Sequence, residues 1–250
     1  MPFAELARKY EDEFFRDMDT LNVGRPDLTL RVSEHIDDII DFIKCTIDNK
    51  MAYVSSDGSV YFDVGAYGPK KYEFFKNVQH ASPDSVANEN KKSPADFALW
   101  KSAKPGEPSW PVVWTAGGKT THGRPGWHIE CSTLSKLAFG SSFDIHSGGE
   151  DLIFPHHQNE VAQTVAHGCV CHPKEWVAHW LHTGHLHLVA PGGKNDEKMS
   201  KSLGNIVTVS QLLGANHELG NISVPEFRIF VASTHYRDRM FQALSFLFLL

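Results

Sequence analysis

The stretch Lys198-Met199-Ser200-Lys201-Ser202 says the most about the fold of this chain. It places two ammonium groups and two hydroxyls within five residues, after the turn-forming segment Pro191-Gly192-Gly193. A loop of this kind can bring lysines onto a polyphosphate, where they offset the charge that shifts during phosphoryl or nucleotidyl transfer. Because short basic matches often arise by chance, a solvated basic loop is the alternative, and the neighbouring segments must decide.

A cysteine, a histidine and a glutamate upstream form a candidate metal site. Pro155 suits the first position of a helix. A helix that begins there places His156 and Glu160 four residues apart on one face. Cys131 supplies a thiolate from another element, and three ligands of mixed type suit an open zinc site. His157 points elsewhere on this helix and is the weaker candidate. The alternative is a capped helix with exposed histidines.

Three segments, in this order, resemble the cysteinyl-tRNA synthetase family of class I aminoacyl-tRNA synthetases, eukaryotic type. They are Gly126 to Ser132, His146 to Glu160, and the lysine pentapeptide Lys198 to Ser202. The resemblance runs from about Tyr10 to about Arg237. It implies an α/β fold: the second half of a Rossmann-like nucleotide-binding fold, with an inserted α+β connecting domain.

The resemblance also implies a division of the chain into four segments. Residues 1–32 would end the first half of the catalytic fold, and residues 33–125 would form the connecting domain. Residues 126–190 would form the second half, and residues 191–250 the lysine-loop region with the start of a helical domain. The family's His-Ile-Gly-His signature and its N-terminal cysteine ligand have no match in this sequence. We therefore expect a central fragment without the anticodon-binding domain.

The activity implied by the resemblance is ATP-dependent activation of cysteine to cysteinyl-adenylate, followed by transfer to tRNA(Cys). Zn²⁺ would be held by Cys131, His156 and Glu160, and the substrate thiolate would bind the metal. Trp127 would line the cysteine pocket. A cytoplasmic location is expected, and the oligomeric state stays open.

ATP, with Mg²⁺, would meet residues from two places in the chain. Lys198 and Lys201 would be the catalytic lysines that stabilise the triphosphate, with Lys201 the stronger candidate. The strand end near residue 148 would bind nucleotide as well, since open α/β sheets bind ligands at the carboxyl ends of strands. The residues expected to bind ATP are Gly148, Gly149, Asp151, Lys198, Met199, Ser200, Lys201 and Ser202.

Two other functions remain open at this point. One is the cysteine ligase of the mycothiol pathway, which shares the core of the fold but joins cysteine to an amino sugar. The other is a non-catalytic zinc-binding fragment. The segment His182-Thr183-Gly184-His185 has the letters of the absent signature with one change, but it lies in an apolar and histidine alternation typical of a strand. We interpret it as structural.

Composition excludes several classes of protein. The chain has 250 residues, 41% of them hydrophobic, which is enough for a substantial core. Four cysteines without paired spacing fit a reducing compartment. No apolar run is long enough for a membrane span. A net charge of −6 argues against broad affinity for nucleic acid, so a tRNA contact would need local basic patches.

Periodicity predicts the local elements. Residues 3–21 form an amphipathic helix, and a second helix starts at Ser33 as its N-cap. Residues 51–63 form a hairpin, and residues 64–95 a variable loop. Cys169 to His172 is a loop beyond a helix end rather than a metal clip.

Overall fold

The computed structural model describes residues 2–75, 89–189, 197–198, 207–213, 222–238 and 240–243. These residues divide into two compact units. One unit is formed by residues 30–181, and the other by residues 1–29 together with 182–250. The division into four segments expected from the sequence stays a prediction.

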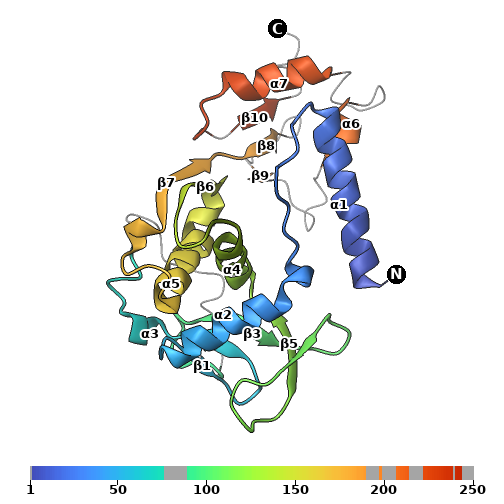
Figure 1. Cartoon of the computed structure of the whole chain (residues 1–250). Helices are drawn as coiled ribbons and strands as arrows, with labels where there is room; N and C mark the ends of the chain where they lie inside the picture. Colours follow the sequence, from blue (N-terminus) through green and yellow to red (C-terminus); the bar gives the residue numbers. More distant parts are fainter. Residues whose placement is uncertain are drawn as a thin grey trace. The chain divides into compact units, whose positions relative to one another are not determined.

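The larger unit contains a five-stranded antiparallel sheet with the order β1-β2-β3-β5-β4 (Figure 1). Its strands are β1 (Ala52–Val54), β2 (Val60–Phe62), β3 (Phe97–Ser102), β4 (Trp110–Val112) and β5 (Thr121–Pro125). The hairpin predicted for residues 51–63 is confirmed, with Ala52 opposite Phe62. Its turn uses Gly58 at a φ of +86°, which L side chains rarely adopt.

Helix α2 (Ile36–Asp48) packs on this sheet through an apolar face. Its isoleucines recur at helical spacing, and Ile39 and Ile43 are fully buried in the core with Leu99 and Trp100 of β3. The predicted start at Ser33 is wrong: a 3₁₀ turn, η1 (Val32–Glu34), comes first and His35 is the N-cap.

Much of the segment predicted as a variable loop has a fixed structure. Asp63 caps the short helix α3 (Val64–Tyr67) by accepting a hydrogen bond from the Ala66 N–H at 2.8 Å. Tyr72 then donates a hydrogen bond to Asn159. The loop prediction overlooked this cap; residues 76–88 lie outside the described chain.

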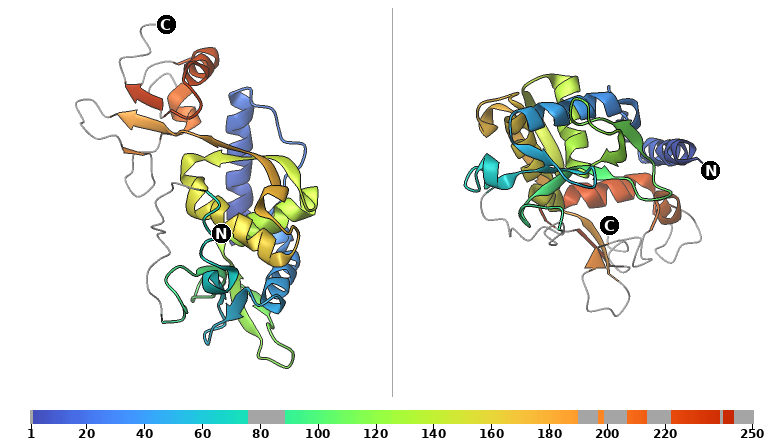
Figure 2. Two further views of the ribbon diagram at one scale, coloured as in Figure 1. Left: turned by 90° about the vertical axis from the view of Figure 1, so that its left-hand side faces the viewer. Right: turned by 90° about the horizontal axis from the view of Figure 1, so that it is seen from below.

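The rest of this unit alternates helices and strands, as the fold class predicts. Its elements are α4 (Trp127–Phe139), β6 (Phe143–Gly149), the short turns η3 (Glu150–Leu152) and η4 (Ile153–His157), α5 (Gln158–His167), η5 (Pro173–Glu175) and β7 (Val177–Thr183). Helices α4 and α5 pack against each other and against α2, and β6 pairs with β7 (Figure 2). Cys169 and Cys171 follow the end of α5 as a loop, as predicted.

The other unit contains α1 (Phe3–Thr20), β8 (Leu186–Val189), β9 (Glu197–Lys198), α6 (Val209–Leu213), α7 (Val224–Ser233) and β10 (Met240–Ala243). Strand β8 pairs with β10 in parallel and with β9 in antiparallel orientation. Arg228 of α7 donates a hydrogen bond to the carbonyl of Leu21, just after α1. Among the described residues, no helix combines the length and apolar character that a bilayer crossing requires.

Candidate metal centre

The start of α4 is fixed against the sheet by Gly126. Its N–H donates to the carbonyl of Leu99 at 2.8 Å, and a Cβ at this position would lie 2.1 Å from the carbonyl oxygen of Ala98. Only glycine allows so close an approach of the two backbones. Cys131, one helical turn further along α4, is therefore held at a defined place beside α5.

His156 and Glu160 reach the site from η4 and α5. Helical backbone begins at Pro155, as predicted, although the residues up to His157 form part of the π-turn η4 and the regular α-helix α5 starts at Gln158. The extended backbone of Phe154 interrupts the helical geometry just before it. The predicted spacing nevertheless holds, because His156 Nε2 lies 3.0 Å from Glu160 Oε1.

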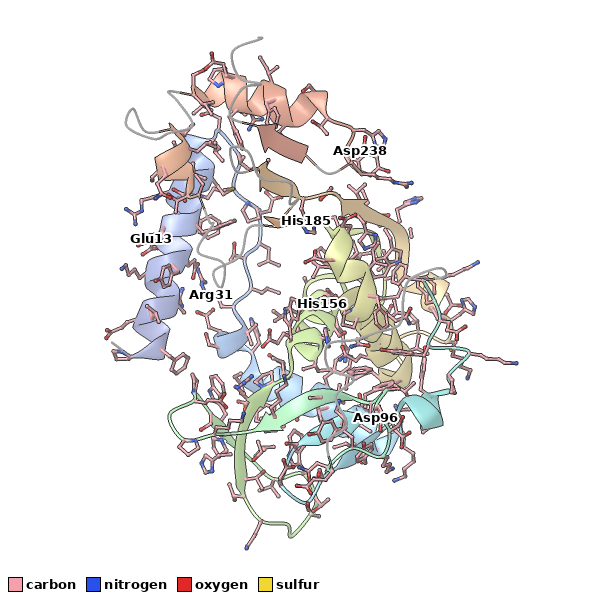
Figure 3. The ribbon with its side chains drawn as sticks, turned by 180° about the vertical axis from the view of Figure 1, so that it is seen from behind. Glu13, Arg31, Asp96, His156, His185 and Asp238 are labelled. Carbon is pink, nitrogen blue, oxygen red and sulfur yellow. The ribbon has the colours of Figure 1, made fainter. Side chains whose placement is uncertain are left out.

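The three predicted metal ligands come together. Ligand atoms of Cys131, His156 and Glu160 all lie within 4.8 Å of one another. A tetrahedral zinc with bonds of about 2.0–2.3 Å has ligand atoms roughly 3.3–3.8 Å apart, so small movements would close this set around one ion. Figure 3 labels His156 in the interior of its unit.

An unsatisfied buried oxygen supports the fit to a metal. Glu160 is 0% exposed, and its Oε1 has no hydrogen-bond partner among the described residues. His156 Nε2 is close to this oxygen, but the two are not aligned as a hydrogen bond. Both atoms therefore suit a common third partner, and a divalent cation would satisfy both at once.

The electrostatics of the two acidic ligands differ. Burial on its own would raise the pKa of the Glu160 carboxyl, but interactions with His146 and His156 outweigh it and lower the pKa to about 2. Burial, together with the charges of Glu160 and Glu130, raises the pKa of the Cys131 thiol far above its usual range. Without a cation the thiol stays protonated, and a metal would displace its proton.

A second histidine pair lies beside Glu160: the sequence analysis did not propose His146 and gave His157 only as the weaker candidate. His146 Nε2, in the middle of β6, lies 2.9 Å from Glu160 Oε2, and His157 Nε2 lies 3.9 Å from Oε1. His157 thus faces the site, contrary to the prediction that it points elsewhere. These two histidines and Glu160 are a second potential ligand set. Rings of Trp176 and Trp180 lie close to His146, which suits a role in orienting Glu160 better than open coordination.

His128 was also missed, although it stands in the quoted segment Gly126 to Ser132. Its Nδ1 lies 2.9 Å from Nδ1 of His156, and both rings are buried. Burial, aided by the neighbouring His156, lowers the pKa of His128 to about 3. His128 is therefore neutral near pH 7. A signal was present in its spacing, since His128 and Cys131 are three residues apart on one helix.

The residues expected to bind substrates lie around this cluster. Trp127 is 59% exposed, and its ring centroid lies 4.5 Å from that of His156. Gly148 lies near the end of β6, where a Cβ would meet Cδ1 of Leu152 at 2.8 Å and Cε1 of His157 at 3.0 Å, so a larger residue would require these side chains to shift. Gly149 precedes the turn η3 that contains Asp151.

The lysine pentapeptide is described only at its first residue. The backbone of Lys198 ends strand β9, where it pairs with His187 of β8. Met199, Ser200, Lys201 and Ser202 lie outside the described residues. The catalytic assignment of the two lysines therefore stays a prediction.

Sequence comparison shows to which family of proteins the chain is related. The family model described as "tRNA synthetases class I (C) catalytic domain" matches residues 1–244. The chain is 48% identical to a cysteine–tRNA ligase of Thermococcus kodakarensis over 94% of its own length and 45% of that protein. It is 45% identical to a probable mitochondrial cysteine–tRNA ligase of Xenopus tropicalis, covering 93% of the chain and 37% of that protein. The chain thus spans less than half the length of these relatives.

Solved structures agree on the fold. A methionyl-tRNA synthetase of Mycobacterium tuberculosis in complex with methionyl-adenylate superposes with a TM-score of 0.59 at 20% identity, covering 96% of this chain and 54% of that one. A putative arginyl-tRNA synthetase of Campylobacter jejuni gives a TM-score of 0.54 at 12% identity, covering 96% and 41%. At these identities the likeness establishes the class I synthetase fold alone.

Proposed function

The chain belongs to the class I (C) tRNA synthetase catalytic-domain family, and from this premise we propose that it carries the cysteine-selecting part of a cysteine–tRNA ligase. The full reaction would activate cysteine with ATP to cysteinyl-adenylate and then transfer cysteine to tRNA(Cys). The observation that carries the proposal is the convergence of Cys131, His156 and Glu160 in a chain whose relatives are cysteine–tRNA ligases.

Cys131, His156 and Glu160 would hold Zn²⁺. When bound, the metal would supply a Lewis-acidic centre that takes a thiolate readily and a serine hydroxyl poorly at neutral pH. The chain's own residues would balance the charge of the ion and orient its ligands. Glu160 and Cys131 would balance the charge of the ion, and His146 would fix the orientation of the Glu160 carboxylate.

Substrate contacts follow from the arrangement around the cluster. Trp127, exposed beside His156, would cover the cysteine side chain and limit the entry of water. Gly148, Gly149 and Asp151 would meet ATP at the end of β6, where open α/β sheets bind ligands.

The lysine pentapeptide would supply positive charge to the phosphates. Lys198 and Lys201 would act as the catalytic lysines, and Met199, Ser200 and Ser202 would complete the loop that binds ATP with Mg²⁺. The ammonium groups of the two lysines would offset the negative charge that develops as pyrophosphate leaves.

The remaining parts of the proposal concern the setting of the reaction. The Thermococcus relative is a cysteine–tRNA ligase, so tRNA(Cys) would be the macromolecular partner of this chain. The cytoplasmic location expected from the sequence belongs to the same proposal. The four segments 1–32, 33–125, 126–190 and 191–250 belong to the same proposal.

The test uses cobalt as a spectroscopic substitute for zinc. Co²⁺ added to the metal-free chain should give a thiolate-to-metal charge-transfer band in the near ultraviolet, owing to Cys131. Adding L-cysteine should strengthen the band, because a second thiolate joins the metal, whereas L-serine should leave it unchanged. A response that is equal for both amino acids would rule out selection of cysteine at this metal.

A further inference from the structure

Two buried imidazoles, His128 and His156, contact each other through the same ring atom. Their Nδ1 atoms are 2.9 Å apart, and the ring planes meet at 66°. Each residue is 3% exposed. At this distance and burial the contact is a direct hydrogen bond between the rings, and water does not mediate it.

The chemistry of imidazole limits how this hydrogen bond can be made. A neutral ring carries one N–H and one lone pair, so exactly one of the two Nδ1 atoms can donate. The other nitrogen of His156, Nε2, is the one near Glu160 Oε1. If Nε2 gives its lone pair to a metal, the proton of His156 must be on Nδ1 and needs an acceptor. The described residues provide Nδ1 of His128 in that place.

We propose that His128 is a positioning residue of the metal centre: its Nδ1 accepts the Nδ1–H of His156 and so directs the lone pair of His156 Nε2 toward Cys131 and Glu160. This inference rests on the proposed ligation of zinc by His156. Metal-ligating histidines commonly donate their second N–H to such a partner, which fixes the tautomer and the orientation of the ring.

Metal binding would then reverse the hydrogen bond between the rings. Without metal, His156 carries its proton on Nε2 beside Glu160 and accepts from Nδ1–H of His128. With metal bound, His156 carries its proton on Nδ1 and donates to Nδ1 of His128, whose own proton moves to Nε2. The pair holds two ring protons in both states, so the proton count balances.

The surroundings of His128 hold it in place for this role. It is the second residue of α4, directly after the start that Gly126 fixes against β3. The ring of Phe97 meets it edge-on at 6.0 Å, and the ring of Trp127 stacks on it at 5.6 Å. A ring packed in this way can exchange its tautomer without moving, whereas a rotation would disturb these contacts.

Two variants separate positioning from packing. His128→Phe keeps a ring of similar shape but removes the acceptor, whereas His128→Asn loses the ring but keeps an oxygen near the position of Nδ1. We expect the zinc dissociation constant to rise about 10- to 100-fold in the phenylalanine variant and to stay within about threefold in the asparagine variant. A role in packing alone would give the reverse order, and that result would overturn the inference.

Imidazole nitrogen NMR of the 250-residue chain gives an independent readout. On titration with zinc, the protonated nitrogen of His128 should change from Nδ1 to Nε2 while that of His156 changes in the opposite sense. If zinc binds and is lost in Cys131→Ser, but His128 keeps its tautomer, the positioning role is wrong and the proposed metal site stands. If the parent chain binds no zinc, the proposed metal site itself fails, and the inference fails with it.

Discussion

At the scale of single residues, the carboxylate of Glu160 places the strongest demand on its surroundings. It is fully buried, and three imidazoles lie within 3.9 Å of its oxygens. An isolated buried carboxylate would cost far more free energy than a small domain has to spare. The ring of histidines therefore serves to keep the charge of Glu160 inside the protein, and a metal would use that charge.

Changing Cys131 to serine should remove zinc from this centre. The thiolate is the softest ligand of the set, and a serine hydroxyl stays protonated near neutral pH. We expect zinc bound after dialysis to fall to roughly a tenth of the parent value or less, measured by elemental analysis. Cys45→Ser is the matched control, because Cys45 contacts the carbonyl of His167 away from the site. Unchanged zinc in Cys131→Ser would exclude this residue as a ligand.

His167 should make the stability of the larger unit depend on pH. Burial, and then the charge of Lys136, lowers the pKa of His167 from 6.5 to about 4. The unfolded chain therefore takes up the proton first as pH falls. The stability that the neutral ring contributes is present above pH 6.5 and is lost as pH falls through 4.

The check compares melting temperatures of the parent and of His167→Gln between pH 7.5 and pH 4. The two curves should converge as pH falls, because only the parent loses the contribution of a neutral His167. Lys136→Met is a useful control: without the ammonium 3.3 Å from Nε2, the pKa of His167 should lie closer to 6.5, so the loss of stability on acidification should be smaller and should end at a higher pH. Parallel curves for all three proteins would show that the protonation of His167 does not affect the stability of the protein.

The three metal candidates could be found from the sequence, whereas their supporting residues could not. Cys131, His156 and Glu160 carry the residue types and the i, i+4 spacing that chemistry requires. His128 contacts His156, 28 residues away along the chain, and His146 contacts Glu160, 14 residues away. Both contacts join different elements, and no local period of the sequence encodes them. His157 was misplaced although it has helical backbone angles and precedes Glu160 by three residues, a spacing that places two residues on one helix face.

At the scale of elements, the start of α4 decides where His128 and Cys131 lie. Gly126→Ala would place a Cβ 2.1 Å from a backbone oxygen of β3, which cannot move without disturbing the sheet. We expect a loss of about 1–3 kcal/mol in the free energy of unfolding, as for other overpacked sites. All six tryptophans lie between residues 30 and 181, so their fluorescence in urea reports on this unit.

A matched glycine in the same unit serves as the control for this substitution. Gly65 lies in α3, where a Cβ would meet only the side-chain oxygen of Asp63 at 3.3 Å. Gly65→Ala should change stability by less than about 1 kcal/mol, since a helix gains from alanine what the tighter contact costs. Equal stability of the two variants would mean that the approach of Gly126 to β3 is relaxed in solution.

Elements could be predicted from the sequence where the local hydrophobic pattern alone determines them. The hairpin over residues 51–63 and the amphipathic helix that begins at Phe3 follow from such patterns. Ser33 failed as a cap because the chain first makes a 3₁₀ turn, and sequence alone does not separate the two. The prediction of a variable loop over residues 64–95 failed at α3 because the local cap Asp63 was overlooked, and at Tyr72 because its contact with Asn159 spans 87 residues.

At the scale of the whole molecule, the two compact units have unequal shares of the chemistry. The larger unit holds the whole metal cluster together with Trp127 and the end of β6. Lys198 belongs to the other unit. The residues proposed for the reaction are therefore divided between the two units.

A protein of these 250 residues alone should fail in cysteine-dependent ATP–pyrophosphate exchange. It spans 45% of the length of its Thermococcus relative, and its sequence contains no His-Ile-Gly-His. Catalysis of this kind depends on holding ATP and cysteine in one geometry, and an incomplete site loses that advantage, which can exceed about 7 kcal/mol. The full-length relative assayed beside it is the positive control.

The segment from His182 to His185 gives this last prediction its sharpest test. It joins β7, which ends at Thr183, to β8, which starts at Leu186, and the N–H of Gly184 donates to the carbonyl of Tyr236 at 2.8 Å. A phosphate site would instead need free N–H groups at the start of a helix. Exchange by the pure chain that disappears in a His182→Ala, His185→Ala double variant would show that this segment binds ATP after all. Exchange that survives the double variant would show that the 250 residues hold a complete nucleotide site elsewhere.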